Sequence, residues 1–166
     1  VDGFHVVNQG YLYQKRAGVV CATPKGIINL LNAYNINPMF KHAVVIGRSK
    51  IVGLPVAKLL LDLGATVTIC HSKTKNLSEH VKRADLVIAA VGKPKMITKD
   101  MIKKNAIVVD VGVNRVNKHL VGDVDFEEVS KIASMITPVP KGVGPMTINA
   151  LLENTYELFL SHLTEK

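Results

Sequence analysis

The chain has 166 residues, 48% of them hydrophobic and 5% aromatic, and a formal net charge of +8 at pH 7. This length suits one domain with a sizeable core, and no apolar run approaches the roughly 20 residues that a membrane-spanning helix needs. The positive charge favours anionic partners, but the basic residues are spread along the chain without interleaved aromatic side chains. We therefore expect phosphorylated or carboxylated small molecules as partners, and neither nucleic acid nor a membrane.

The two cysteines and six histidines show neither disulfide nor metal-ligand spacing. Cys21 and Cys70 are far apart, and the histidines are scattered. We expect reduced thiols, no metal and a cytoplasmic location, with no signal-peptide pattern at the start. Because the chain opens on Val1-Asp2-Gly3 without an initiator methionine, we also expect it to be part of a longer protein.

Apolar periodicity and turn residues predict an alternation of helices and strands along the chain. In chain order these are helix 23–34, strand 42–46, helix 56–63, strand 66–70, helix 77–82, strand 84–91, helix 98–103, strand 106–111, helix 126–131, strand 134–137 and helix 147–162. Thr23 and Pro24 are expected as N-cap and N1 of the first helix, and Gly64 as C′ of the second. The alternation predicts an α/β fold, a Rossmann-like doubly wound parallel sheet with helices on both faces. Residues 1–166 are expected to form one domain, with a connector over about residues 1–40.

The stretch Val44–Pro55 is typical of a dinucleotide-binding turn. An apolar strand ends at Gly47, Arg48 and Ser49 follow, and Gly53 precedes a helical run. Such a turn lets the backbone approach a pyrophosphate, and the helix N-terminus supplies free N–H groups. The spacing is not G-x-G-x-x-G, because Ser49 stands where the second glycine would be, so a purely structural turn is the alternative.

Glycines follow the ends of three predicted strands. Gly47, Gly92 and Gly112 each lie just after the C-terminal end of a strand. In open α/β sheets ligands bind at that edge. Three such glycines favour a ligand-binding edge over isolated turns.

The residues after the second strand favour NADP over NAD. An NAD site usually carries an acidic residue there, which binds the ribose 2′-hydroxyl, whereas this chain reads His71-Ser72-Lys73-Thr74. Ser72, Lys73 and Arg48 offer hydroxyl and cationic donors to a 2′-phosphate. The alternative is a solvated turn over residues 71–75.

Several motifs, in one order and covering almost the whole chain, resemble the bifunctional methylenetetrahydrofolate dehydrogenase/cyclohydrolase family. They are Val1–Phe4, Thr23–Gly26, Gly47–Pro55, His71–Thr74, Asp110–Arg115, Gly122–Val124 and Thr137–Thr147. The resemblance implies NADP-dependent oxidation of 5,10-methylenetetrahydrofolate to the methenyl form, then hydrolysis to 10-formyltetrahydrofolate. It also implies a homodimer.

The resemblance also implies roles for individual residues. The implied cofactor-binding residues are Gly47, Arg48, Ser49, Ser72 and Val113, and the implied folate-binding residues are Asp2, Pro140, Lys141, Gly142, Val143 and Gly144. Without the resemblance, Asp2 would be an ordinary turn residue and the 140–144 loop a rigid connector. Lys141 departs from the family, which usually has glycine there; a side chain restricts the backbone and also offers a cation near the folate carboxylates.

The catalytic lysine of the family, with a tyrosine four residues before it, is expected in a preceding domain that this chain lacks. Tyr11 and Lys15 have the same spacing, but they precede the nucleotide strand and are interpreted as part of the connector. We therefore expect no catalytic residue here, and NADP binding without turnover. The alternatives are a non-catalytic NADP-binding or assembly module and an NAD-linked variant of the family.

Overall fold

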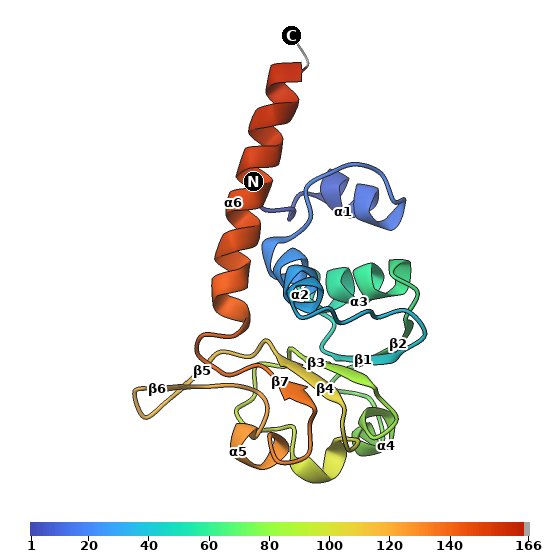
Figure 1. Cartoon of the computed structure of the whole chain (residues 1–166), viewed down its shortest axis with the longest axis vertical. Helices are drawn as coiled ribbons and strands as arrows, with labels where there is room; N and C mark the ends of the chain where they lie inside the picture. The colour runs from blue at the N-terminus through green and yellow to red at the C-terminus, as the bar shows by residue number, and fades with distance from the viewer. Residues whose placement is uncertain (165–166) are drawn as a thin grey trace.

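A parallel sheet of five strands forms the centre of the structure, a computed structural model that describes residues 1–164. Its strand order is β2-β1-β3-β4-β7, with every neighbouring pair parallel (Figure 1). The strands are β1 (His42–Ile46), β2 (Thr66–Cys70), β3 (Leu86–Ala89), β4 (Ile107–Asp110) and β7 (Met135–Ile136). The chain leaves β1 for the outer strand β2 and returns on the other side of β1, so the carboxyl ends of β1 and β3 flank a topological switch point.

Helices cover both faces of this sheet. They are α1 (Val6–Tyr13), α2 (Ala22–Ala33), α3 (Gly53–Asp62), α4 (Leu77–Val81), the 3₁₀ turn η1 (Lys99–Met101), α5 (Phe126–Val129) and α6 (Val143–Thr164). Helices α2 and α3 lie on one face, α4, η1 and α5 on the other, and α6 packs along α2 and extends past it (Figure 1). Within residues 1–164 no helix is both long and apolar enough to cross a bilayer.

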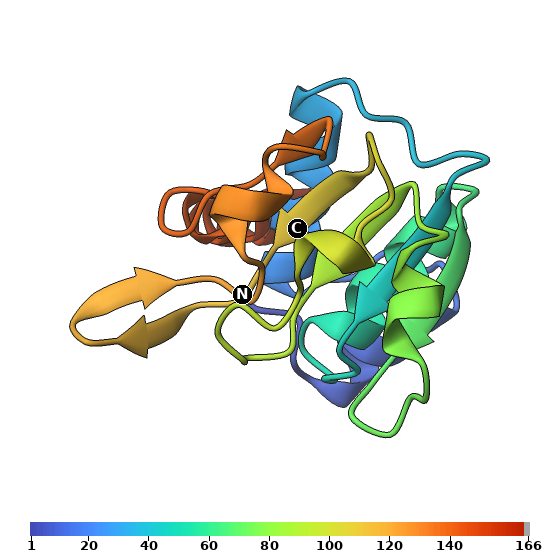
Figure 2. The same cartoon turned by 90° about the horizontal axis from the view of Figure 1, so that it is seen from below.

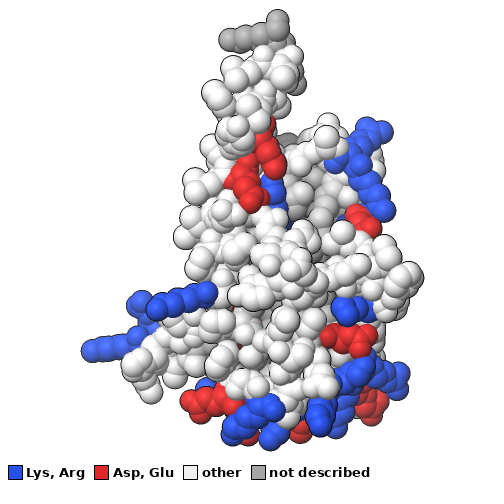
Figure 3. All heavy atoms as spheres, viewed as in Figure 1, with Lys and Arg blue, Asp and Glu red and all other residues white. Residues whose placement is uncertain are grey.

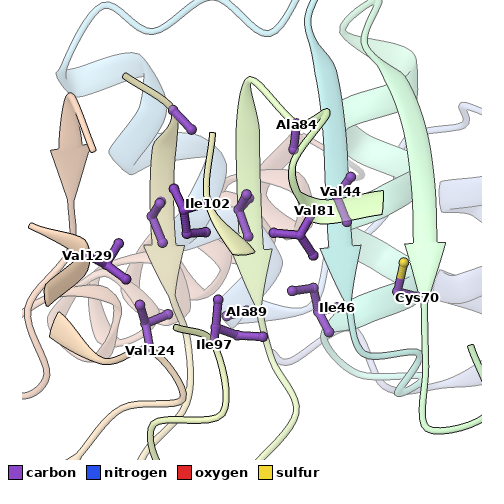
Figure 4. Close-up of a cluster of buried hydrophobic side chains, with 13 residues drawn as sticks. Val44, Ile46, Cys70, Val81, Ala84, Ala89, Ile97, Ile102, Val124 and Val129 are labelled. Carbon is purple, nitrogen blue, oxygen red and sulfur yellow. The ribbon is translucent and has the colours of Figure 1, made fainter. Parts of the chain in front are cut away.

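The two faces of the sheet bury separate apolar clusters, because successive side chains of a strand point to opposite faces. Val44 and Ile46 of β1 belong to the cluster beneath α4 and α5 (Figure 4), whereas Ala43 and Val45 pack against α2 and α3. Strand β3 is buried at all four positions. This continuous burial explains why the strands appear in the sequence as uninterrupted apolar runs. The predicted doubly wound α/β sheet is confirmed.

Three helices begin earlier than predicted, and all three carry proline at their third residue: Pro24 in α2, Pro55 in α3 and Pro145 in α6. The first N–H groups of a helix have no intrahelical acceptor, so a proline in the first turn loses no hydrogen bond. The predicted cap of α2 was wrong in detail. Cys21 is its N-cap, and the Asp2 carboxylate accepts the Ala22 N–H at 3.0 Å.

Other elements differ from the prediction in length. The predicted helix 98–103 is only the 3₁₀ turn η1, and strands 84–91 and 106–111 are four residues each. Helix α1 lies in the expected connector, where no helix was predicted. It buries no residue, so its sequence lacks a clear apolar periodicity.

The antiparallel hairpin β5 (Asn114–Val116) and β6 (His119–Val121) was not predicted. It stands away from the body (Figure 2) and turns at Asn117 and Lys118, both with positive φ. That backbone suits a two-residue hairpin loop.

Candidate functional site

The turn after β1 is so tightly packed that it requires glycine at two positions. Gly47 has φ +128°, and a Cβ there would lie 2.2 Å from the carbonyl oxygen of Ala90, beside the end of β3. A Cβ on Gly53 would lie 2.3 Å from the carbonyl oxygen of Gly47. The chain therefore folds back on itself at the switch point, where Gly47 and Gly53 place no side chain between the packed backbone segments.

This turn presents a run of free hydrogen-bond donors. The Ser49 Oγ accepts the N–H groups of Val52 and Gly53 at 3.1 and 3.2 Å, which secures the start of α3. Within residues 1–164 the backbone N–H groups of residues 48–51 have no acceptor. Four consecutive donors beside the N-terminus of a ten-residue helix form an anion-binding arrangement of the kind that holds a pyrophosphate.

A cavity of about 220 Å³ opens beside the turn and is lined from the ends of β1, β2 and β3. Its lining residues are Ile46, Gly47, Arg48, His71, Ser72, Leu77, Ala90, Val91, Lys93 and Met96. It brings together three of the predicted cofactor residues, Gly47, Arg48 and Ser72. None of these lining residues is acidic, and two are cationic, so the cavity favours an anionic ligand.

The segment after β2 is an ordered turn. The His71 N–H donates to the Thr74 Oγ1 at 2.8 Å, and the Lys73 N–H donates to the His71 Nδ1 at 3.1 Å. With these bonds formed, the exposed Ser72 lies at the mouth of the cavity. The turn is thus both structural and part of the site.

A second cavity, of about 380 Å³, lies beyond the end of β4. Its lining residues are Asp110, Val111, Val113, Leu120, Pro138, Val139, Pro140, Lys141, Gly142, Val143, Gly144, Pro145 and Ile148. All five residues of the predicted folate loop are among them. Val113, predicted to contact the cofactor, lines this second cavity rather than the first.

Lys141 adopts the left-handed conformation that glycine favours, with φ +76°. The neighbouring Gly142 is closely packed, since a Cβ there would lie 2.3 Å from the carbonyl oxygen of Pro138. Both residues also line a larger, mainly apolar cavity of about 580 Å³ between α2 and β7.

Asp2 does not line either of the two cavities at the carboxyl edge of the sheet. Its carboxylate is bonded to the start of α2, and the Val1 carbonyl accepts a hydrogen bond from the Asn154 Nδ2 at 3.0 Å. These contacts fix Asp2 beside the middle of α6. Its role toward the pterin stays a prediction.

Lys15 is held away from the candidate site, and Tyr11 is not among the residues that line either cavity at the carboxyl edge of the sheet. Tyr11 is on α1, and the Lys15 ammonium pairs with the Asp62 carboxylate at 3.0 Å. Asp62 ends α3, whereas the phosphate-binding turn begins it. A ten-residue helix is about 15 Å long, so the Lys15 ammonium is held at the far end of α3.

Two buried carboxylates of the site were missed by the sequence reasoning. Asp110 and Asp123 are 3% and 0% exposed, and the Asp110 carboxylate accepts the N–H groups of Gly112, Asp123 and Val124 at 2.9 to 3.0 Å. Burial raises the pKa of Asp110 despite these bonds. An aspartate beside a glycine at a buried strand end was the available signal.

Lys and Arg side chains gather at the lower end of the molecule, with acidic side chains among them (Figure 3). Two ion pairs of the chain join Lys103 to Asp85 at 2.6 Å and Lys99 to Glu128 at 3.8 Å. Part of the positive charge is therefore neutralised locally. Within residues 1–164 no three His, Cys, Asp or Glu side chains gather as a metal site would require.

The glycine-bounded turn at a switch point, the donors at the start of α3 and the basic cavity together define an NAD(P)-binding α/β domain. A family model described as "Tetrahydrofolate dehydrogenase/cyclohydrolase, NAD(P)-binding domain" matches residues 21–163. The chain belongs to the tetrahydrofolate dehydrogenase/cyclohydrolase family, of which it is the NAD(P)-binding domain.

Individual relatives agree with this assignment. The chain is 63% identical over 165 residues to the bifunctional protein FolD of Acholeplasma laidlawii, covering 99% of this chain and 60% of the relative. The crystal structure of the FolD dehydrogenase/cyclohydrolase from Campylobacter jejuni matches with a TM-score of 0.92 and 55% identity, over 94% of this chain and 56% of that one.

The Trypanosoma brucei FolD structure, complexed with NADP cofactor and inhibitor, matches with a TM-score of 0.92 and 39% identity, over 98% of this chain and 58% of that one. The chain thus spans about three fifths of the length of these relatives.

Proposed function

We propose that this chain is the cofactor-binding part of an enzyme that oxidises 5,10-methylenetetrahydrofolate with NADP and hydrolyses the methenyl product to 10-formyltetrahydrofolate. The observation that carries the proposal is the presence of two cavities at the carboxyl edge of one sheet. One contains the phosphate-binding turn, and the other contains the 138–145 loop. A hydride transfer needs the two ligands held in contact, which two cavities at the same edge of one sheet favour.

We propose NADP rather than NAD as the cofactor, because the cavity after β2 offers donors and no carboxylate. Arg48 and Ser72 line it, and the Lys73 side chain belongs to the same turn. The 2′-phosphate of NADP would meet repulsion from the acidic residue typical of NAD sites. The complex of the Trypanosoma brucei relative with NADP supports this choice.

The residues of this chain act by binding and positioning. The donors of the turn after β1 hold the pyrophosphate, and the apolar side chains of Val113, Leu120 and Pro140 line the second cavity. The glycines of the 138–145 loop permit a close approach of backbone to a flat ring. NADP, when bound, supplies the hydride acceptor.

The acid/base group is proposed to lie outside this chain. The hydrolysis step needs a positioned proton donor and acceptor, and Lys15 is paired with Asp62 at the far end of α3. We therefore propose that these 166 residues alone bind NADP without turnover. A homodimer and a preceding catalytic domain of the same polypeptide are part of this proposal.

Calorimetric titration with NADP and with NAD tests the proposal, together with a dehydrogenase assay on methylenetetrahydrofolate. We expect NADP to bind at least tenfold more tightly than NAD, with no turnover. Turnover by the isolated chain would place the acid/base group within it. Failure to bind either dinucleotide would overturn the proposed function.

A further inference from the structure

The carboxylate of Asp123 accepts three successive backbone N–H groups from the segment that follows β3. The N–H of Val91 lies 2.6 Å from its Oδ2, the N–H of Gly92 lies 2.9 Å from the same atom, and the N–H of Lys93 lies 2.9 Å from its Oδ1. The Asn114 Nδ2 adds a fourth bond at 2.9 Å. Four donors satisfy a side chain that is completely buried.

Successive N–H groups that converge on one point form a concave anion-binding feature of the backbone. In this protein the anion is a carboxylate of the same chain. The segment 91–93 is bent to reach it, with Gly92 in the left-handed conformation at φ +66°. Asp123 therefore determines the shape of this segment.

The same segment forms one wall of the candidate cofactor cavity. Val91 and Lys93 both line it, together with Gly47 and Arg48 of the phosphate-binding turn. A shift of the segment would change the width of the cavity and move the Lys93 cation. The shape imposed by Asp123 thus reaches the ligand through residues 91–93, without contact between Asp123 and the ligand.

Asp123 is itself held in place from the neighbouring strand. The Asp110 carboxylate at the end of β4 accepts the Asp123 N–H at 2.9 Å. Gly112 and Gly122 leave the space that the two carboxylates fill, since Cβ atoms there would lie 2.1 Å from the Asp123 Cγ and 1.8 Å from the Asp110 Oδ2. The packing of the Asp123 carboxylate thus requires glycine at position 112. This explains Gly112 more specifically than its place at the ligand-binding edge of the sheet does.

We propose that Asp123 is a positioning residue, which fixes residues 91–93 in the shape that the cofactor requires. The inference rests on the proposed function, because it takes NADP as the ligand of this cavity. The network also touches the other cavity. The Asp110 N–H donates to the Thr137 Oγ1 at 2.8 Å, one residue before the 138–145 loop.

The test compares Asp123→Asn with Asp125→Asn in the 166-residue chain. The Asp123→Asn substitution keeps the size of the side chain but turns an amide N–H₂ toward N–H donors. Asp125 is two residues away, and its half-buried carboxylate pairs with the Lys95 ammonium at 3.5 Å, so its variant controls for the loss of one charge. We expect the NADP dissociation constant to rise at least tenfold in Asp123→Asn and less than twofold in Asp125→Asn.

A spectroscopic readout separates positioning from general destabilisation. In ¹⁵N–¹H spectra the amide signals of residues 91–93 should move in Asp123→Asn, while those of β1 and β2 stay in place. A folded Asp123→Asn chain that binds NADP within twofold of wild type would overturn the inference alone. Wild type that fails to bind NADP would overturn the proposed function, and the inference with it.

If Asp123→Asn does not fold, Gly92→Ala takes its place. The added Cβ meets no atom within 4 Å, so only the left-handed backbone of the segment is penalised. We expect about a fivefold rise in the NADP dissociation constant together with a lower urea midpoint, because alanine is less stable than glycine in this conformation. Unchanged NADP affinity in this variant would overturn the inference.

Discussion

Gly47 lies directly against the carbonyl group of Ala90, so that a Cβ on the glycine would be 2.2 Å from the oxygen. This contact joins the ends of β1 and β3, the two strands that flank the switch point. The phosphate-binding turn and one wall of the cavity are therefore mutually dependent. A change at either residue should affect the other loop.

Gly47→Ala should weaken both the fold and cofactor binding. The methyl group must displace the Ala90 carbonyl, and alanine rarely adopts φ +128°. We expect the free energy of unfolding in urea to fall by about 1–3 kcal/mol and NADP affinity to fall at least tenfold by calorimetry. Wild-type values of both quantities in the Gly47→Ala variant would contradict the packing described for this turn.

Ser72→Asp should reverse part of the preference for NADP. A carboxylate at the mouth of the cavity repels a 2′-phosphate and can accept the hydrogen of a ribose hydroxyl. We expect NADP affinity to fall at least tenfold, a loss of about 1.4 kcal/mol or more, and NAD affinity to fall less. Ser161→Asp makes the same charge change near the end of α6 and should leave both affinities unchanged.

Gly26→Ala should destabilise the packing of α2 on α6. A Cβ there would lie 2.6 Å from the Met146 carbonyl oxygen, which cannot move without disturbing the first turn of α6. Urea unfolding should show a loss of about 1–3 kcal/mol. Gly10→Ala is the matched control, because its Cβ meets nothing within 4 Å and alanine favours helix α1 by about 0.5–1 kcal/mol.

Asp85 should contribute to acid unfolding. The hydrogen bond from Lys103 at 2.6 Å, with the backbone N–H of His42 at 3.0 Å, holds the pKa of Asp85 below its ordinary value of 3.8. The folded state thus favours the ionised form, so the stability it adds is present above the ordinary pKa and is lost as pH falls through the lowered one.

Urea unfolding measured from about pH 5 down to about pH 2 should therefore show a shallower loss of stability in Asp85→Asn than in wild type. Glu79→Gln, on the exposed surface of α4, serves as the control and should follow the wild-type curve. Parallel curves for wild type and Asp85→Asn would show that Asp85 contributes nothing to the pH dependence of the unfolding free energy.

Lys141→Gly should be tolerated by the fold, because the backbone already has φ +76°. Glycine adopts this conformation without the roughly 1 kcal/mol that a side chain costs there, but it loses more entropy on folding. We expect the unfolding free energy to change by less than about 1 kcal/mol. A larger loss would mean that the Lys141 side chain itself holds the 138–145 loop.

The sheet was predictable because its strands are buried on both faces and appear as unbroken apolar runs. The bounds of β1 and β2 were predicted correctly, and Gly64 ends α3 as expected, with φ +85°. The starts of the helices were less predictable. Their first turns are stabilised by distant groups such as the Asp2 carboxylate, twenty residues before Ala22.

The candidate site was predictable where a single segment carries it, as in the turn from Gly47 to Gly53. The parts that depend on long-range contacts were not. Asp123 accepts hydrogen bonds from residues about thirty positions earlier in the chain, and no local sequence pattern indicates a contact between positions so far apart. Val113 was placed with the cofactor, but the turn after β4 brings it to the second cavity.

The Ser49 hydroxyl oxygen receives hydrogens from both Val52 and Gly53. With its lone pairs so engaged, the hydroxyl can only give its own hydrogen to a ligand, as the N–H groups of residues 48–51 do. The turn thus has a single hydrogen-bonding polarity. A phosphodiester, which has acceptor oxygens and no hydrogens to donate, matches it at every position, whereas an ammonium group, which has only donors, would find no acceptor there.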